Sequence, residues 1–202
     1  MQRSGLLVVF LGFCLLSACA VTETQSSLNA NSASPLDPLA TQVDEQGQYK
    51  LLMDLAVMEL KQQRYKQAEP LLQKLRKLNR DDIAVYRMLA RAYEGQQKQH
   101  LALLAWQQIN QFAQHTIDDE AEYARLALVE DEYQIAELVY QQWLNSDQLN
   151  HRLSALNNLG FSRLLQKDFA QARSYFQQAL KIDPLNSKAL NNLILVDALT
   201  GR

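Results

Sequence analysis

Small and large apolar residues recur along this chain with a period of 34 residues from Tyr49 onward. With Tyr49 as position 1, small residues occupy positions 8 and 20 of four successive repeats, and large apolar residues occupy most of positions 7, 17 and 24. The small residues are Ala56, Ala90, Ala124 and Gly160 at position 8, and Ala68, Ala102, Ala136 and Ala172 at position 20. Small side chains let two helices approach closely, and one helix hairpin cannot bury its apolar face alone. The period therefore predicts a stack of helix hairpins.

The repeat boundaries follow from this register. We expect four hairpins over residues 49–82, 83–116, 117–152 and 153–186, with two inserted residues before the fourth. Residues 187–202 form a half-repeat with an amphipathic pattern, which predicts a C-terminal capping helix. Asp81-Asp82 and Asp118-Asp119 lie where first helices should begin, and Asp183-Pro184 lies where a helix should end.

The stretch from Leu153 to Pro184 resembles the tetratricopeptide repeat. Its matching residues are Leu156, Leu159, Gly160, Phe169, Ala172, Phe176, Ala179 and Pro184, at positions 4, 7, 8, 17, 20, 24, 27 and 32. The resemblance implies an all-α solenoid whose first helices line a concave groove, with ligand contacts at positions 2, 5, 6, 9, 12 and 13. The groove residues that it predicts here are Arg87, Arg91, Arg125, Asn157, Asn158, Phe161, Leu164, Lys188, Asn191 and Asn192.

Composition supports helices and excludes several classes of protein. The chain has 36 Leu, 24 Gln and 23 Ala but only 9 Val and 6 Ile, so an all-β or α/β domain is not expected. A net charge of −2 gives no electrostatic basis for nucleic-acid binding. Six glycines in 202 residues leave too few for phosphate-cradling loops.

The first 18 residues are typical of a secretory signal, because Arg3 precedes a short apolar run that ends near Leu16. The sequence Leu16-Ser17-Ala18-Cys19 resembles the lipobox of bacterial lipoproteins, which implies cleavage before Cys19 and lipidation of that residue. An ordinary secretory signal with a chance cysteine is the alternative. Ala20, rather than Asp, follows the cysteine, and by the same resemblance this favours the outer membrane, with the body in the periplasm.

Residues 19–48 are rich in Ser, Thr, Asn, Gln and Ala and show no lasting apolar stripe. Such a stretch cannot bury enough surface to offset its ordering entropy, so we expect a flexible tether. Cys14 and Cys19 are the only cysteines. The processed chain would therefore contain no disulfide, and packing alone would hold its fold.

No residue pattern indicates catalysis, a cofactor or a metal site. His100, His115 and His151 have no His or Cys partner at metal-ligand spacing, and we interpret them as surface residues. The acidic clusters 118–120 and 130–132 flank one predicted helix. We interpret the first as part of the helix N-terminus and the second as a solvated loop. A pair of carboxylates that catalyses hydrolysis is the alternative. Trp106 and Trp143 lie at core positions 24 and 27.

The layout of lipobox, tether, four repeats and cap resembles the TadD family, the tetratricopeptide lipoproteins of tight-adherence (Flp) pilus assembly systems. Its distinctive residues are the Asn-Asn-Leu-Gly stretch at 157–160 and the Asn-Asn-Leu stretch at 191–193. The resemblance implies an outer-membrane scaffold that binds a protein or peptide partner, such as a secretin or another pilus-assembly component. The alternatives are a pilotin of type IV pili, an envelope adaptor that recruits peptidoglycan enzymes and, as a different class, an enzyme.

Overall fold

The computed structural model describes residues 44–201, and these residues form nine α-helices. The helices are α1 (Glu45–Lys61), α2 (Tyr65–Leu78), α3 (Ile83–Gly95), α4 (Gln99–Ile109), α5 (Ile117–Val129), α6 (Tyr133–Trp143), α7 (Leu149–Leu165), α8 (Phe169–Ile182) and α9 (Ser187–Thr200). The predicted signal peptide, the lipobox with Cys19 and most of the predicted tether lie outside the described residues. The expected all-α repeat fold is confirmed.

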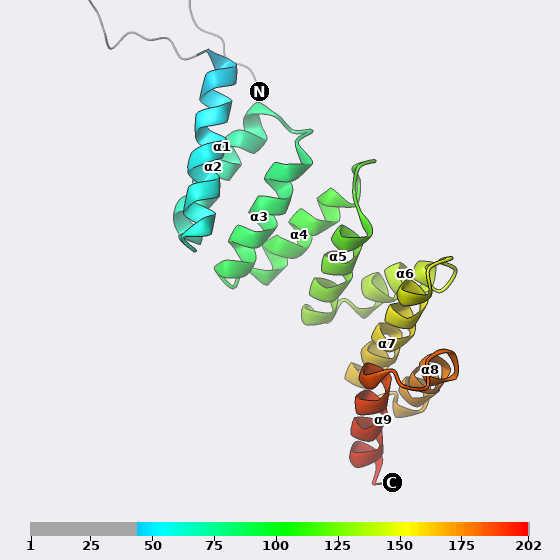
Figure 1. The fold of residues 1–202 in the computed structure, drawn as a ribbon. Coiled ribbons are helices and arrows are strands. Elements are labelled where there is room, and N and C mark those ends of the chain that lie inside the picture. Colours follow the sequence, from blue (N-terminus) through cyan, green and yellow to red (C-terminus); the bar gives the residue numbers. More distant parts are fainter. Residues whose placement is uncertain (1–43, 202) are drawn as a thin grey trace, which may run out of the picture. The chain divides into compact units, whose positions relative to one another are not determined.

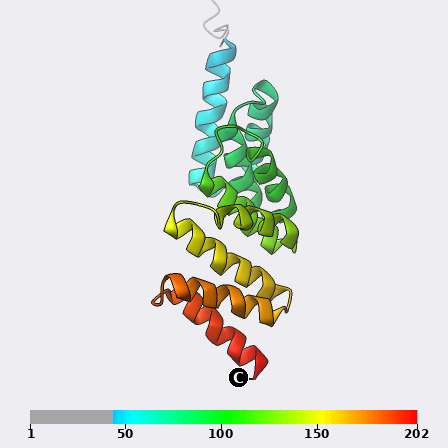
Figure 2. The ribbon, with the colours of Figure 1, turned by 90° about the vertical axis from the view of Figure 1, so that its right-hand side faces the viewer.

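The helices pair as antiparallel hairpins, and the hairpins stack in chain order. α1 packs on α2, α3 on α4, α5 on α6 and α7 on α8, and each hairpin also contacts the next (Figure 1). α9 covers the last hairpin by contacting both α7 and α8, and Figure 2 shows these three helices as successive layers. Between hairpins, the second helix of each hairpin packs against the first helix of the next: α2 on α3, α4 on α5 and α6 on α7.

A single turn geometry recurs between the two helices of each hairpin. One residue of each turn has a positive φ: Gln63 at 56°, Gln97 at 60°, Asp131 at 59° and Lys167 at 63°. Their spacing is 34, 34 and 36 residues, which matches the repeat period and the two inserted residues. The insertion lengthens α7, which begins at Leu149, four residues before the start of the fourth repeat frame.

The small residues of the period lie in the core. All seven alanines at positions 8 and 20 are fully buried. The remaining small residue, Gly160 on α7, faces the ring of Phe176 on α8, and a Cβ added there would lie 2.5 Å from a ring carbon. Only glycine fits at this helix crossing without movement of Phe176. The small residues of the 34-residue period therefore mark the places where helices pack closely.

Two helix starts differ in detail from the sequence prediction. α1 begins at Glu45, within the range predicted for the tether, because the Asp44 side chain accepts a hydrogen bond from the Gly47 amide at 2.6 Å and caps the helix. α5 is capped by Thr116 rather than by the acidic pair alone, and Asp119 completes a reciprocal capping box with it. Asp82 caps α3 as expected.

Residues 43–202 form one compact unit with its own core. The largest apolar cluster runs from Leu52 to Leu159, and two smaller clusters join α7, α8 and α9. Trp106 and Trp143 are buried, as expected from their repeat positions. A unit with its own core is able to fold independently. Among residues 44–201, no helix combines the length and apolar content that a membrane span requires.

Candidate ligand-binding groove

A cavity of about 620 Å³ lies along the first helices of the first three hairpins. It is lined by Val57, Leu60 and Lys61 of α1, Tyr65 of α2, Met88, Arg91, Glu94 and Gly95 of α3, Trp106 of α4 and Glu122 of α5. The repeat register creates it, because equivalent turns of α1, α3 and α5 present their side chains next to one another. We refer to this cavity as the inter-repeat groove.

The inter-repeat groove has an apolar side. Val57 and Leu60 from α1 and Met88 from α3 are half-buried, and Trp106 is 5% exposed. The indole Nε1 of Trp106 donates a hydrogen bond to Glu94 at 3.1 Å, which ties the ring to α3. A partially exposed apolar surface of this kind suits an apolar side chain of a ligand.

The carboxylates of the groove are already neutralised. Arg125 on α5 bonds to Glu94 on α3 and to Glu122 on its own helix, the latter at 2.7 Å. Burial alone would lower the pKa of Arg125, but its hydrogen bonds to Glu122 and Glu94 outweigh burial and raise that pKa. This cluster joins the second repeat to the third and is unavailable to a ligand without breaking its bonds.

The cations Arg91 and Lys61 complete the groove and are free in this structure. Both are exposed, and within residues 44–201 neither forms an ion pair. The groove therefore offers two uncommitted cations beside an apolar surface. That combination suits an acidic group adjacent to an apolar one.

The predicted groove residues of the middle repeats have different roles. Arg91 lines the inter-repeat groove as expected. Arg87 instead forms a two-pronged ion pair with Asp119, with N–O distances of 2.8 and 2.7 Å, and so connects α3 to α5. Arg125 is held by the two carboxylates described above. Of the three predicted arginines, Arg91 is thus the one left to contact a ligand.

Two predicted residues of the fourth repeat are buried and are not exposed groove positions. Asn157 is 5% exposed, and its amide donates hydrogen bonds to the Leu153 carbonyl and to Asn186, which links α7 to the start of α9. Leu164 is 8% exposed and packs with α8 and α9. These two predictions are corrected: both side chains serve helix–helix contacts, because α9 covers this part of α7.

The other predicted residues near the C-terminal end lie apart from the inter-repeat groove. Phe161 is 37% exposed, Lys188 and Asn191 are exposed, and Asn158 and Asn192 are half-buried. None of them lines the groove of the first three hairpins. They remain predicted contacts for a ligand that extends along the stack.

The sequence prediction missed the contribution of the first repeat. Val57, Leu60 and Lys61 occupy positions 9, 12 and 13, and Met88 occupies position 6 of the second repeat. These are ligand-contact positions of the same register, so extending the rule to α1 would have found them. Trp106 could not be found this way, because position 24 is a core position and the ring is buried as well as lining the groove.

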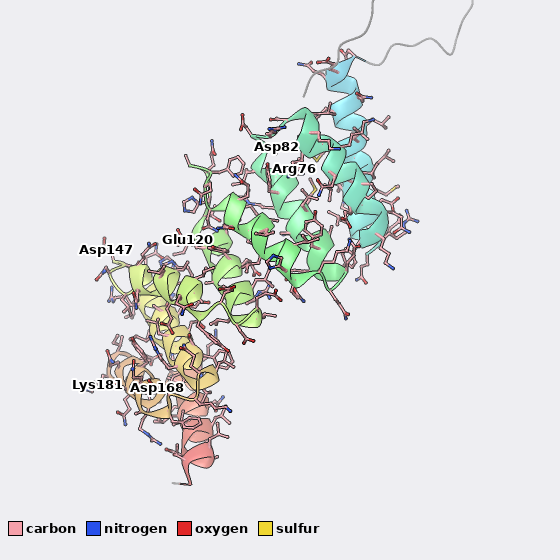
Figure 3. The ribbon with its side chains drawn as sticks, turned by 180° about the vertical axis from the view of Figure 1, so that it is seen from behind. Arg76, Asp82, Glu120, Asp147, Asp168 and Lys181 are labelled. Carbon is pink, nitrogen blue, oxygen red and sulfur yellow. The ribbon has the colours of Figure 1, made fainter. Side chains whose placement is uncertain are left out.

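The remaining chemistry-bearing residues have structural partners. His115 lies between the Phe112 carbonyl and Glu120, and Glu120 also accepts a hydrogen bond from Trp143 at 2.6 Å. Figure 3 labels Glu120 within the middle of the stack. Within the described part of the chain, no three His, Cys, Asp or Glu side chains are arranged to hold a metal ion. The acidic cluster 118–120 thus contributes to a helix cap and to contacts between helices.

These observations define the class: the described residues form a tetratricopeptide-repeat solenoid, an architecture typical of protein-interaction scaffolds. The tetratricopeptide repeat family matches residues 154–186, which lie within the predicted fourth repeat. Among curated proteins, none matches the chain in sequence.

Solved structures with the same fold are similar over most of the chain. MamA is 14% identical, with a TM-score of 0.63, and the match covers 77% of this chain and 84% of MamA. YrrB, described as a tetratricopeptide protein with an unusual peptide-binding site, is 13% identical, with a TM-score of 0.57 and coverage of 74% and 76%. PilF of Pseudomonas aeruginosa is 16% identical, with a TM-score of 0.55 and coverage of 77% and 70%.

Proposed function

We propose that this protein is a lipid-anchored scaffold at the outer membrane whose inter-repeat groove binds an extended segment of a pilus-assembly protein. The observation that carries the proposal is the groove itself, where Arg91 and Lys61 are free beside the apolar surface of Met88 and Trp106. An extended segment with an acidic residue next to an apolar residue would complement both features. Stacked repeats suit such a ligand because they present one continuous surface.

Two further points support a role in envelope assembly. The lipobox-like sequence ending at Cys19 favours an anchored protein whose body faces the periplasm. The sequence layout resembles TadD lipoproteins, and the fold is similar to that of Pseudomonas aeruginosa PilF. We therefore propose assistance to the secretin or to another component of a tight-adherence pilus. A pilotin of type IV pili is the second candidate, and an envelope adaptor for peptidoglycan enzymes is the third.

The anchor makes the first prediction. Cys19→Ser is expected to abolish incorporation of labelled palmitate and to release the protein from the outer-membrane fraction, because the thiol is the predicted site of lipidation. Cys14→Ser, which changes the other cysteine, serves as the control and should leave both readouts intact. Persistence of label and of outer-membrane location in Cys19→Ser would show that the signal is misassigned.

The groove makes the second prediction. Arg91→Glu combined with Lys61→Glu should slow association with the purified periplasmic part of the secretin and weaken the salt dependence of that rate, because exposed charges mainly steer encounters. Phe161→Ala, which truncates the exposed apolar residue predicted to contact the ligand farther along the stack, should instead speed dissociation. Surface plasmon resonance separates the two rates.

Lys167→Glu combined with Lys181→Glu is the matched control, since both residues are exposed, lie outside the groove and change the net charge equally. Equal weakening by the control pair would place the binding surface elsewhere. If the secretin does not bind, and deletion of the gene leaves secretin assembly and piliation normal, the pilus role is wrong and the envelope adaptor takes its place.

A further inference from the structure

The first hairpin carries a concentration of positive charge, of which only Lys61 also lines the inter-repeat groove. Residues 61–80 contain seven Lys and Arg residues and one carboxylate, a formal charge of +6. All seven cations are exposed, and among the described residues six of them form no ion pair. These six, which we call the basic face, are Lys61, Lys66, Lys74, Arg76, Lys77 and Arg80.

The one carboxylate of this stretch does not neutralise the basic face. Glu69 bonds to Lys98 at 2.7 Å and to Gln96 at 2.8 Å, both in or beside the second hairpin. The hydrogen bond from Lys98 is the main reason why the pKa of Glu69 lies below its ordinary value. The seventh cation, Arg64, is paired with Glu59. The charge of the basic face is therefore exposed to solvent.

Part of the basic face surrounds a hollow. Arg76, Lys77 and Arg80 line a cavity of about 530 Å³, whose other lining residues are Asp81, Tyr86 and Gln108. Three cations and one carboxylate thus converge on a space that can accept a polar anionic group. Figure 3 labels Arg76 at this end of the stack.

The charge changes sign along the chain. Residues 94–147 contain ten carboxylates against two Lys or Arg residues, a formal charge of −8. Figure 3 labels Glu120 and Asp147 of this stretch farther along the stack from Arg76. An anionic surface would attract the first hairpin and repel the third, so it would orient the unit as well as bind it. Charge asymmetry of this kind is typical of chains that contact an anionic surface such as a membrane.

We propose that the basic face of the first hairpin binds the anionic phospholipid headgroups of the membrane to which the chain is anchored. The inference rests on the proposed lipid anchor, because residue 19 precedes the first described residue by only 25 positions. A flexible coil of 25 residues has a root-mean-square span of about 25–30 Å, so the proposed anchor and tether would keep the first hairpin near the headgroups. Clusters of four to eight Lys and Arg residues next to a membrane attachment typically bind anionic lipids.

The test uses the unlipidated unit of residues 43–202 and vesicles of phosphatidylcholine with or without phosphatidylglycerol. The unit should co-sediment with the phosphatidylglycerol vesicles only, and less at high salt. Arg76→Glu with Lys77→Glu should weaken binding by at least about tenfold. The control pair Lys181→Glu with Lys188→Glu has the same change of charge at exposed sites of the last hairpin and cap, and should bind as the parent does.

Several results would overturn the proposal. Three outcomes would each exclude specific binding of anionic lipid by the basic face. They are absence of vesicle binding, equal binding to uncharged vesicles, and equal loss of binding in the two charge-reversal pairs. Capture of a soluble polyglutamate peptide by the basic face, without vesicle binding, would identify an acidic protein as its partner instead. Circular dichroism of each variant, together with the neutral pair Arg76→Gln and Lys77→Gln, separates loss of binding from loss of fold. Failure of the anchor itself is reported independently by palmitate labelling of Cys19→Ser.

Discussion

Replacement of Ala172 by tryptophan is expected to lower the free energy of unfolding by about 1–3 kcal/mol or more. Ala172 on α8 is fully buried at repeat position 20, where it packs beside Leu164, Phe176 and Val196. An indole at this position must displace its neighbours or force the fourth hairpin apart from α9. For a unit of this size each kcal/mol lowers the melting temperature by about 2–4 °C.

Thermal unfolding followed by circular dichroism at 222 nm measures this effect. Ala170→Trp is the matched control, because Ala170 lies on the same helix two residues earlier and is exposed. The control should cost only the small difference in helix propensity between the two residues. Equal melting temperatures for the two variants would contradict the assigned repeat register.

The repeat register was predictable because its determinants are local in sequence. Small residues at positions 8 and 20 identify the close helix contacts, and the structure buries every one of the alanines among them. The start of α1 was missed because the period begins at Tyr49, whereas the helix is set by a cap at Asp44 that lies outside the period. A single capping residue in a polar stretch gives a weaker signal than a repeated apolar pattern.

The ligand surface was only partly predictable, because availability depends on pairing between repeats. Arg87, Arg91 and Arg125 occupy ligand-contact positions, yet only Arg91 is left free once Arg87 and Arg125 meet carboxylates of neighbouring helices. Those partners lie 31 and 32 residues away in the chain. A rule based on one repeat at a time does not include them. Asn157 illustrates the same point, since the position is buried by a contact with Asn186 of the following segment.

The ion pair between Arg87 and Asp119 is the contact between repeats whose loss should matter most. Asp119 is 4% exposed, and its carboxylate accepts two hydrogen bonds from Arg87 and two from Thr116. Asp119→Asn removes the charge, leaves Arg87 without its partner and weakens the cap of α5. Loss of one partner from a buried pair typically costs about 3–5 kcal/mol, and partial exposure of Arg87 places the expected loss near the lower end of that range.

Urea unfolding at neutral pH measures this loss, with Asp118→Asn as the control. Asp118 is the adjacent carboxylate in the same first turn and is exposed, so its replacement should cost only the weak helix-dipole interaction, about 0.3–1 kcal/mol. In an Arg87→Met background, Asp119→Asn should lower the free energy of unfolding much less, because the ion pair that the substitution breaks is already absent. Equal costs for Asp118→Asn and Asp119→Asn would mean that the pair contributes little.

The same pair predicts how stability depends on pH. Hydrogen bonds from Arg87, opposed by burial and assisted by Thr116, lower the pKa of Asp119 below its ordinary value of 3.8. The Asp119 carboxyl therefore binds a proton more readily in the unfolded chain than in the folded chain. The stability that the ionised carboxylate contributes is complete above the pKa of Asp119 in the unfolded chain, and it disappears as pH falls through the lower pKa of the folded chain. The free energies of unfolding of the parent and of Asp119→Asn should converge on acidification below pH 4.

Because the pair joins α3 to α5, its loss should also broaden the urea transition as the first two repeats uncouple from the third. Parallel curves with unchanged breadth at every pH would contradict this role.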